Sequence, residues 1–312
     1  MTDGSFSFII FWHEETEKEQ TAVKYIYIVN RFQTKDRTDE LIRKLEKVSR
    51  EMDRDFEIRV YETPEEAGTI RKDYKYTEHI LTAIGGDGSI NCLLNDIADT
   101  HNILSFIPSG TGNDFYRAVS QNVAAGIHRA DIVRINDRYF INAACFGIDA
   151  DIANDESFIH NRFIPKSMRF NASVVRHFLS YRKGRFLKVE CNGEVYEGEV
   201  TTVVAANSQY YGGGYRISPE SRIDDGKMEL YIFDHMNRPK MAKTILSMKN
   251  AGHLNSPALK RMQTNRAVIT ASEPFQANID GEALLSDRFD IEMIPAGIRL
   301  EYNPVFVESM LK

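Results

Sequence analysis

The chain has 312 residues, of which 42% are hydrophobic and 27% charged, and its formal net charge is −6 at pH 7. This length allows two domains of ordinary size, and the composition is typical of a globular protein rather than a disordered one. The negative charge disfavours a protein that binds nucleic acid in general, because such proteins are usually basic. The negative net charge is compatible with a local basic patch that contacts anionic lipid.

The cysteines and the lengths of the apolar segments indicate the cellular location of the protein. Cys92, Cys145 and Cys191 are widely spaced and form no Cys-x-x-Cys pair, which predicts reduced thiols in a cytoplasmic protein. No segment approaches the roughly 18 apolar residues that span a bilayer. Residues 1–20 are expected to be an N-terminal extension. Its role stays open between an added edge strand, a membrane-touching tail and a misassigned start.

Segments typical of strands and helices alternate in the first part of the chain. Strands are expected at 23–29, 56–62, 78–84 and 103–107, and helices at 36–53 and from Pro64, Ser89 and Asp114. The alternation indicates a parallel sheet with right-handed crossovers. We therefore predict an α/β domain with a Rossmann-like parallel sheet over residues 21–130.

The pattern changes after this point. Asn136-Asp137 and Asn192-Gly193 each lie between strand-like runs and predict tight hairpins. The other expected elements are helical inserts at 166–183 and 238–252 and strands at 227–233, 267–271, 275–279, 289–294 and 298–301. Antiparallel strands with short turns indicate a β-sandwich domain over residues 131–295. A C-terminal segment, 296–312, can then return to the first domain.

Two glycine-rich loops follow the third and fourth predicted strands. They read Gly85-Gly86-Asp87-Gly88-Ser89-Ile90-Asn91 and Ile107-Pro108-Ser109-Gly110-Thr111-Gly112-Asn113-Asp114-Phe115. Glycines let the backbone approach a ligand closely, and the N–H groups at the start of the next helix favour phosphate. A carboxylate such as Asp87 suits that place only with Mg²⁺ between it and the phosphates. The loops therefore predict a nucleotide-binding site for a Mg²⁺–nucleotide at the carboxyl edge of the sheet.

This pair of loops resembles the bacterial diacylglycerol kinase catalytic domain, whose signatures are Gly-Gly-Asp-Gly-Thr and Pro-x-Gly-Thr-x-Asn-Asp-Phe-Ala-Arg. Ser89 replaces the Thr and keeps its hydroxyl, Tyr116 replaces the Ala, and Arg117 is retained. Later segments continue the resemblance, namely Gly212-Gly213-Gly214, Pro219, Ile223 to Glu229 and Asn278-Ile279-Asp280-Gly281-Glu282. Related kinases of NAD, sphingosine and fructose phosphate share only parts of the first loop.

The resemblance implies an ATP- and Mg²⁺-dependent kinase that phosphorylates a lipid hydroxyl, in the first place that of diacylglycerol. Its nucleotide-binding residues would be Asn30, Thr63, Gly85, Gly86, Asp87, Gly88, Ser89, Asn91 and Thr111. Asn30 and Thr63 are also typical of ordinary strand-to-helix turns, and Thr111 of a residue beside a helix N-cap. Arg31 stands where the family usually has Pro, which alters the loop after Asn30.

Carboxylates in the second half of the chain are the candidate catalytic and metal-binding groups. The resemblance implies that Asp280 or Glu282 accepts the proton of the attacking hydroxyl. We favour Glu282, with Asp280 orienting it or holding metal, and a simple turn is the alternative for both. It also implies a second, structural Mg²⁺, bound by the Asp225 side chain and backbone carbonyls near Arg222 and Lys227. For Asp225 the alternative is an ordinary type I turn.

Basic and apolar residues are interleaved from Lys166 to Lys188, as in helices that lie on anionic membranes. A solvated helix that covers the sandwich is the alternative. We therefore predict a cytoplasmic lipid kinase that attaches peripherally to anionic membrane, acts on a membrane-resident lipid and binds no nucleic acid. A homodimer stays open. The alternative functions are an NAD kinase and a catalytically inactive nucleotide-binding regulatory protein.

Overall fold

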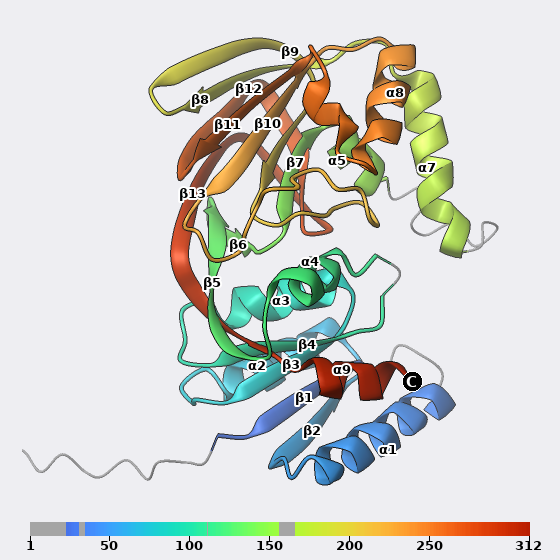
Figure 1. Cartoon of the computed structure of the whole chain (residues 1–312), viewed down its shortest axis with the longest axis vertical. Helices are drawn as coiled ribbons and strands as arrows, with labels where there is room; N and C mark the ends of the chain where they lie inside the picture. Colours follow the sequence, from blue (N-terminus) through green and yellow to red (C-terminus); the bar gives the residue numbers. More distant parts are fainter. Residues whose placement is uncertain (1–22, 31–34, 111, 156–165) are drawn as a thin grey trace, which may run out of the picture.

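The computed structural model describes residues 23–30, 35–110, 112–155 and 166–312. The predicted N-terminal extension and Thr111 lie outside these ranges. Two lobes are stacked along the long axis of the molecule (Figure 1). Within the described residues, no helix combines the length and the apolarity needed to cross a membrane.

The first lobe alternates strands and helices, as predicted. Its elements are β1 (Tyr25–Asn30), α1 (Lys35–Glu51), β2 (Phe56–Tyr61), α2 (Pro64–Asp73), β3 (Ile80–Gly85), α3 (Asp87–Ile97), β4 (Ile103–Pro108) and α4 (Asp114–Asn122). The strands lie in the order β2-β1-β3-β4, and each neighbouring pair is parallel. The predicted parallel pairing is thus confirmed for these four strands. Strands β3 and β4 are buried along almost their whole length, which explains their unbroken apolar sequences.

The second lobe is mainly antiparallel. Its elements are β5 (Gly126–Ile135), β6 (Arg138–Phe140), β7 (Ala143–Gly147), α5 (Ile148–Ala153), α7 (Lys166–Ser180), β8 (Arg185–Cys191), β9 (Glu194–Ala206), β10 (Met228–Asp234), α8 (Arg238–Met248), a 3₁₀ helix η1 (Gly252–Asn255), β11 (Leu259–Thr264), β12 (Arg266–Ile279) and β13 (Glu282–Tyr302). The last helix, α9 (Pro304–Leu311), packs against β4 and α1 of the first lobe. Both predicted hairpins are present, between β5 and β6 and between β8 and β9. In the second hairpin, Asn192 and Gly193 have φ of 53° and 79°, the left-handed values that a two-residue turn requires.

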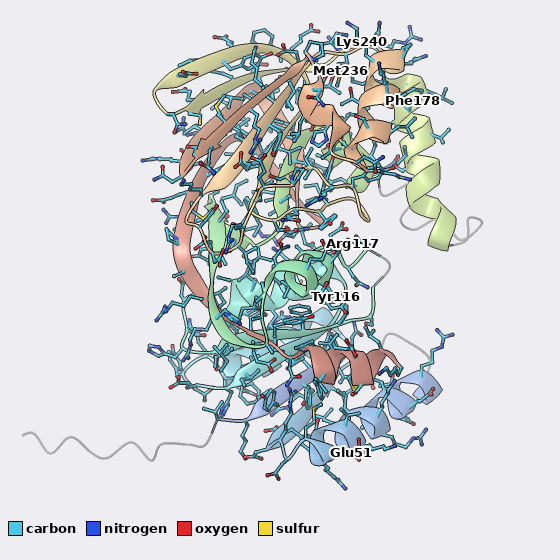
Figure 2. All side chains as sticks on the ribbon, viewed as in Figure 1. Glu51, Tyr116, Arg117, Phe178, Met236 and Lys240 are labelled. Carbon is cyan, nitrogen blue, oxygen red and sulfur yellow. The ribbon has the colours of Figure 1, made fainter. Side chains whose placement is uncertain are left out.

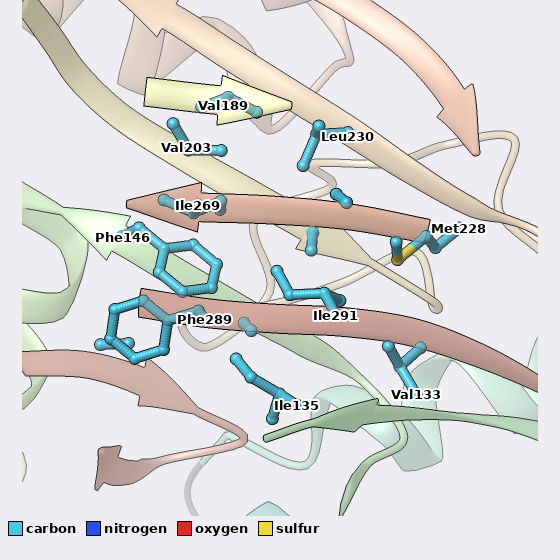
Figure 3. Packing of buried hydrophobic residues seen from close by; sticks show 14 of the residues in the cluster. Val133, Ile135, Phe146, Val189, Val203, Met228, Leu230, Ile269, Phe289 and Ile291 are labelled. Carbon is cyan, nitrogen blue, oxygen red and sulfur yellow. The ribbon is translucent and has the colours of Figure 1, made fainter. Parts of the chain in front are cut away.

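A continuous apolar core fills the second lobe. Figure 3 shows its centre, where the rings of Phe146 and Phe289 lie next to each other. The ring centroid of Phe289 is 5.1 Å from that of Phe146 and 5.2 Å from that of Phe275, and both contacts are edge-to-face. Such pairs add specific geometry to the free energy of apolar burial. They fix β13 against β7 and β12.

The sheets of the two lobes are joined. One hydrogen-bonded sheet runs through both lobes, because β13 pairs antiparallel with β12 in the second lobe and parallel with β4 in the first. The runs expected at 289–294 and 298–301 are parts of this one strand, and those at 267–271 and 275–279 are both parts of β12. Register shifts interrupt the ladder between them. These irregularities look like strand ends in the sequence, but the strands continue past them.

Asp131 holds the irregular point of β13 in place. Its side chain is buried, and its two carboxylate oxygens accept the N–H groups of Ala296 and Gly226, each at 2.7 Å. Ala296 has a φ of 53°, and a Cβ on Gly297 would lie 2.6 Å from the Ile132 side chain. One buried carboxylate and one glycine therefore set where the strand passes from one lobe to the other.

We expect Asp131→Asn to lower the free energy of unfolding by about 1–3 kcal/mol, because the amide turns a donor toward one of the two buried N–H groups. Unfolding in urea would measure the change. Asp137→Asn, in the exposed hairpin turn between β5 and β6, is the matched control. Equal midpoints for the two variants would contradict the role assigned to Asp131.

Candidate active site at the boundary of the lobes

The two glycine loops touch backbone to backbone. They follow β3 and β4, and the N–H of Ser109 donates to the carbonyl of Gly85 at 2.9 Å. A Cβ on Gly110 would lie 2.6 Å from the Cα of Gly86, closer than any side chain permits. Glycine is therefore required at this crossing for the loops to pack, whatever they bind.

The second loop is closed by its own asparagine. Asn113 has a φ of 50°, and its side-chain amide accepts from the N–H of Gly110 at 3.1 Å and donates to the carbonyl of Gly110 at 2.8 Å. Because its side chain is used in this way, Asn113 makes no side-chain hydrogen bond to the start of α4. The helix therefore needs another group to accept from its first N–H groups.

Asp87 is that group. Its carboxylate oxygens accept from the N–H of Asp114 at 3.0 Å and from the N–H of Phe115 at 2.9 Å. Asp87 also lies in the first turn of α3, where a negative charge is favoured by the helix dipole. A carboxylate oxygen has two lone pairs, so each oxygen of Asp87 keeps one beyond these bonds. The residue thus links the two loops and retains the capacity to bind a cation.

Asp114 joins the first lobe to the glycine run of the second. Its buried carboxylate accepts the N–H of Gly213 at 2.7 Å and pairs with the Arg117 guanidinium at 2.7 Å. Burial raises the pKa of Asp114, and the nearby Asp87 charge raises it further. The hydrogen bond from Gly213 has the opposite effect and lowers this pKa. Figure 2 shows Arg117 on α4, where the lobes face each other. A Cβ on Gly214 would lie 3.1 Å from the Arg117 guanidinium.

Asp280 is a buried clamp between elements. With Gly281 it forms the two-residue turn between β12 and β13, at φ of 48° and 96°. Its carboxylate accepts the backbone N–H groups of Ile141, Asn142 and Ala143 at 2.8–3.1 Å. It also accepts the side-chain N–H of Asn91 at 3.2 Å. Burial raises the pKa of Asp280 to about 6, although all four donors favour the charged form.

Glu282 faces the first loop from the other lobe. It is half-buried, two residues beyond the clamp. A Cβ on Gly88 would lie 3.8 Å from the Glu282 Oε1 atom. The pKa of the Cys92 thiol on α3 is raised first by burial and next by the charge of Glu282. The structure therefore brings Glu282 beside the start of α3, while Asp280 lies behind it with its oxygens already engaged.

Other residues assigned to nucleotide binding have partners within the protein. Asn91 is buried and donates to Asp280 and to the carbonyl of Tyr139 at 3.0 Å. The Thr63 hydroxyl accepts the N–H of Glu66 at 3.2 Å as the N-cap of α2. Asn30 ends β1 opposite Tyr61 of β2. Asn91 and Thr63 therefore have structural roles that the sequence assignment did not include.

The segment assigned to a structural metal is a tight turn. The Asp225 carboxylate accepts the N–H of Lys227 at 3.1 Å, and Arg222 pairs with Asp224 at 2.9 Å. Burial raises the pKa of Asp225, and the charge of Asp131 raises it further. Among the described residues, no group of three or more His, Cys, Asp or Glu side chains is placed to hold a metal ion. Any cation here would depend on backbone carbonyls beside one carboxylate.

One contact at the boundary of the lobes was not recognised from the sequence, namely that between Asp114 and Gly213. Asp114 and Gly213 belong to motifs that were noted, but their mutual contact spans 99 positions of the chain. The signal was present in the residue types, since a buried carboxylate needs donors and a glycine run exposes its N–H groups. The sequence did not show that Asp114 and Gly213 lie next to each other in the folded protein.

This geometry defines a two-domain protein in which two glycine loops meet and are faced by a carboxylate of the β lobe. The diacylglycerol kinase catalytic domain model matches residues 24–137, and the YegS C-terminal NAD kinase beta sandwich-like domain model matches residues 142–301. The chain belongs to the bacterial diacylglycerol kinase catalytic-domain family.

Individual relatives agree with this assignment. The chain is 27% identical over 257 residues to a diacylglycerol kinase of Bacillus subtilis, covering 73% of this chain and 81% of that protein. It is 26% identical over 241 residues to a diacylglycerol kinase of Staphylococcus saprophyticus, covering 70% and 74%. A crystal structure of a diacylglycerol kinase from Bacillus anthracis has the same fold, with a TM-score of 0.72, 21% identity and coverage of 90% and 98%.

We expect Asp87→Ala to destabilise the protein by about 1–2 kcal/mol, because it removes the acceptor at the start of α4. Urea unfolding without nucleotide or metal would measure this loss. Asp87→Asn should lose about half as much, since its amide has one acceptor oxygen. Unchanged stability of the alanine variant would mean that Asp87 does not hold the loops together.

Proposed function

We propose that this protein is a lipid kinase that transfers the γ-phosphoryl group of ATP to the hydroxyl of diacylglycerol and so forms phosphatidic acid. The observation that carries the proposal is the meeting of three elements. Two glycine loops abut at the starts of α3 and α4, and Glu282 from the second lobe approaches Gly88 of the first loop. Membership of the family supports the choice of acceptor.

The loops suit the phosphates of ATP. The first N–H groups of α3 and α4 have no partner within their helices, and helix N-termini favour anions. Asp87 accepts the first two N–H groups of α4, which leaves the start of α3, at Gly86 and Gly88, as the natural phosphate contact. Asp87 would hold Mg²⁺ there through its remaining lone pairs, and the ion would neutralise charge on the phosphates.

Glu282 and Asp280 have different roles in this proposal. Glu282 is half-buried and near Gly88, so its carboxylate accepts the proton of the lipid hydroxyl. Asp280 is a positioning residue, because its oxygens already accept four N–H groups of the protein. By fixing the turn before β13, Asp280 fixes the point from which Glu282 projects.

A direct assay tests the function and separates the alternatives. Purified protein is given ATP and Mg²⁺ with either dispersed diacylglycerol or NAD, and the phosphorylated products are separated. Phosphatidic acid formation supports the proposal. Phosphorylated NAD in its place would favour the NAD kinase, and ATP binding without any transfer would favour a regulatory protein.

For Glu282→Gln we predict a kcat lower by about 10²–10⁴, the usual contribution of a general base, with the ATP dissociation constant little changed. Steady-state kinetics and ATP titration give the two values. Glu273→Gln, an exposed carboxylate of β12, is the control. A variant that mainly weakens ATP binding would make Glu282 a nucleotide contact instead.

Asp280→Asn should behave differently from Glu282→Gln. Its amide turns a donor toward the backbone N–H groups of residues 141–143, so the melting temperature should fall together with kcat. The Glu282 variant should keep a melting temperature near that of the wild type. If Asp280→Asn lowered kcat at unchanged stability, Asp280 would be the better candidate for the base.

The proposed structural Mg²⁺ is tested at Asp225. Mg²⁺ should raise the melting temperature of the wild type more than that of Asp225→Ala, because a ligand that binds only the folded state stabilises it. Both are measured without nucleotide, so that the site at Asp87 contributes least. An equal response of the two proteins to Mg²⁺ would remove this metal site.

A further inference from the structure

An arginine of the second lobe lies beside Glu282 at the boundary of the lobes. Arg138 begins β6, the short strand that lies against α3 of the first lobe (Figure 1). Its Nη1 atom donates to the carbonyl of Ala283, the residue after Glu282, at 3.4 Å. The guanidinium is therefore held next to the candidate base, on the side of the site that faces α3.

The thiol of Cys92 is influenced by both of these charges. Cys92 lies one turn after Gly88 on α3. Burial raises the pKa of this thiol most, the charge of Glu282 raises it further, and the charge of Arg138 lowers it. Because such effects weaken with distance, Glu282 and Arg138 both lie near the first turns of α3.

Two asparagines of α3 hold β6 in place. The Asn95 side chain donates to the carbonyl of Tyr139 at 2.9 Å and accepts the N–H of the same residue at 2.8 Å. The Asn91 side chain donates to that carbonyl as well, at 3.0 Å. These amides provide the donors and acceptor that a neighbouring strand would offer. Because Tyr139 follows Arg138 directly, the same bonds fix the backbone from which the arginine projects.

Most hydrogen-bonding capacity of Arg138 is unused. A guanidinium has five N–H donors, and 3.4 Å to the β13 carbonyl is longer than an ordinary N–H···O bond. Arg134, on the paired strand β5, forms an ion pair with Glu292. In the part of the chain that the structure describes, no carboxylate pairs with Arg138 in this way. The guanidinium can therefore bind an anion without first leaving a partner.

We propose that Arg138 is a catalytic residue that binds the γ-phosphate of ATP and stabilises it during transfer to the lipid. The inference rests on the proposed function, in which phosphates contact the start of α3. Glu282 repels these phosphates where it must accept the hydroxyl proton, and a cation beside it offsets the repulsion. A guanidinium also donates to two phosphate oxygens at once, which the point charge of a lysine does not.

Arg138 acts on charge and forms no covalent bond in this step. The lipid oxygen bonds to the γ-phosphorus while the bond from that phosphorus to the bridging oxygen breaks. The electron pair of the broken bond stays with ADP, and the hydroxyl proton moves to Glu282. Negative charge is spread over the three equatorial oxygens of the phosphoryl group in the transition state, and Arg138 donates to these oxygens.

A comparison of ATP with ADP tests the contact without any lipid, because the two differ only in the γ-phosphate. Calorimetry with Mg²⁺ measures the dissociation constants of ADP and of an ATP analogue that cannot transfer its γ-phosphate. Arg138→Gln should weaken binding of the analogue by about tenfold or more, and binding of ADP by less than about twofold. Arg134→Gln, which removes the same charge from the exposed side chain on β5, is the matched control and should change neither value.

Kinetics on diacylglycerol test the catalytic role. Arg138→Gln should lower kcat by about 10²–10³, the usual loss when one donor to a transition-state oxyanion is removed. Arg138→Lys should retain part of this activity, because it keeps the charge and loses the paired donors. Guanidinium chloride below denaturing concentrations should partly restore Arg138→Ala and leave Glu282→Gln unchanged.

A purely structural arginine would behave differently. If Arg138 only held the β13 turn through the Ala283 carbonyl, Arg138→Gln would weaken ATP and ADP equally and lower the melting temperature, which would overturn the proposal. Wild-type binding and kinetics of Arg138→Gln would also overturn it.

The outcome for the lipid kinase assignment is separate. If only the analogue lost affinity for the variant, and the wild type phosphorylated no diacylglycerol, the contact of Arg138 would be supported and the assignment wrong. Equal rates of phosphatidic acid formation by the wild type and Arg138→Gln would do the reverse.

Discussion

The arrangement of the site depends on the buried carboxylate of Asp280. Its oxygens accept three backbone N–H groups at residues 141–143 and the Asn91 amide, so one side chain fastens the β12–β13 turn to the start of β7 and to α3. Removing such a carboxylate from water costs several kcal/mol unless donors replace the solvent. Those donors come from both lobes, and the position of Glu282 relative to Gly88 follows from their meeting.

The loops illustrate how binding and packing requirements coincide. Gly86 and Gly110 are needed because the two loops cross at backbone contact distance, and Asp87 is needed because α4 lacks an acceptor from its own N-cap. The residues of these loops that suit phosphate binding are therefore also the residues that the loops need in order to pack. Loss of activity after mutation of such residues does not by itself identify a ligand contact, and stability must be measured beside it.

Local elements followed from the sequence, while contacts across the chain did not. The Asn192-Gly193 hairpin, the N-terminal turn at Pro64 and the parallel strands were predicted because their signals lie within a few residues. The path of β13 was missed because Pro295 to Gly297 looks like a strand end, and only Asp131, distant in sequence, shows how the strand passes it. Asp280 looked like a turn residue or a base. The turn is real, but the donors that occupy the carboxylate lie about 140 positions earlier.

The paired strands β5 and β13 also determine how the lobes can move. They run antiparallel from Gly126 to Ile135 and from Ile291 to Tyr302, and this ladder passes from one lobe into the other. Bending such a ribbon within its plane would break hydrogen bonds, whereas a two-stranded ribbon accepts a wide range of twist. The low-energy motion is therefore torsional. A rotation of the lobes about the ribbon would therefore strain the Asp114–Gly213 hydrogen bond, which joins the first lobe to the second.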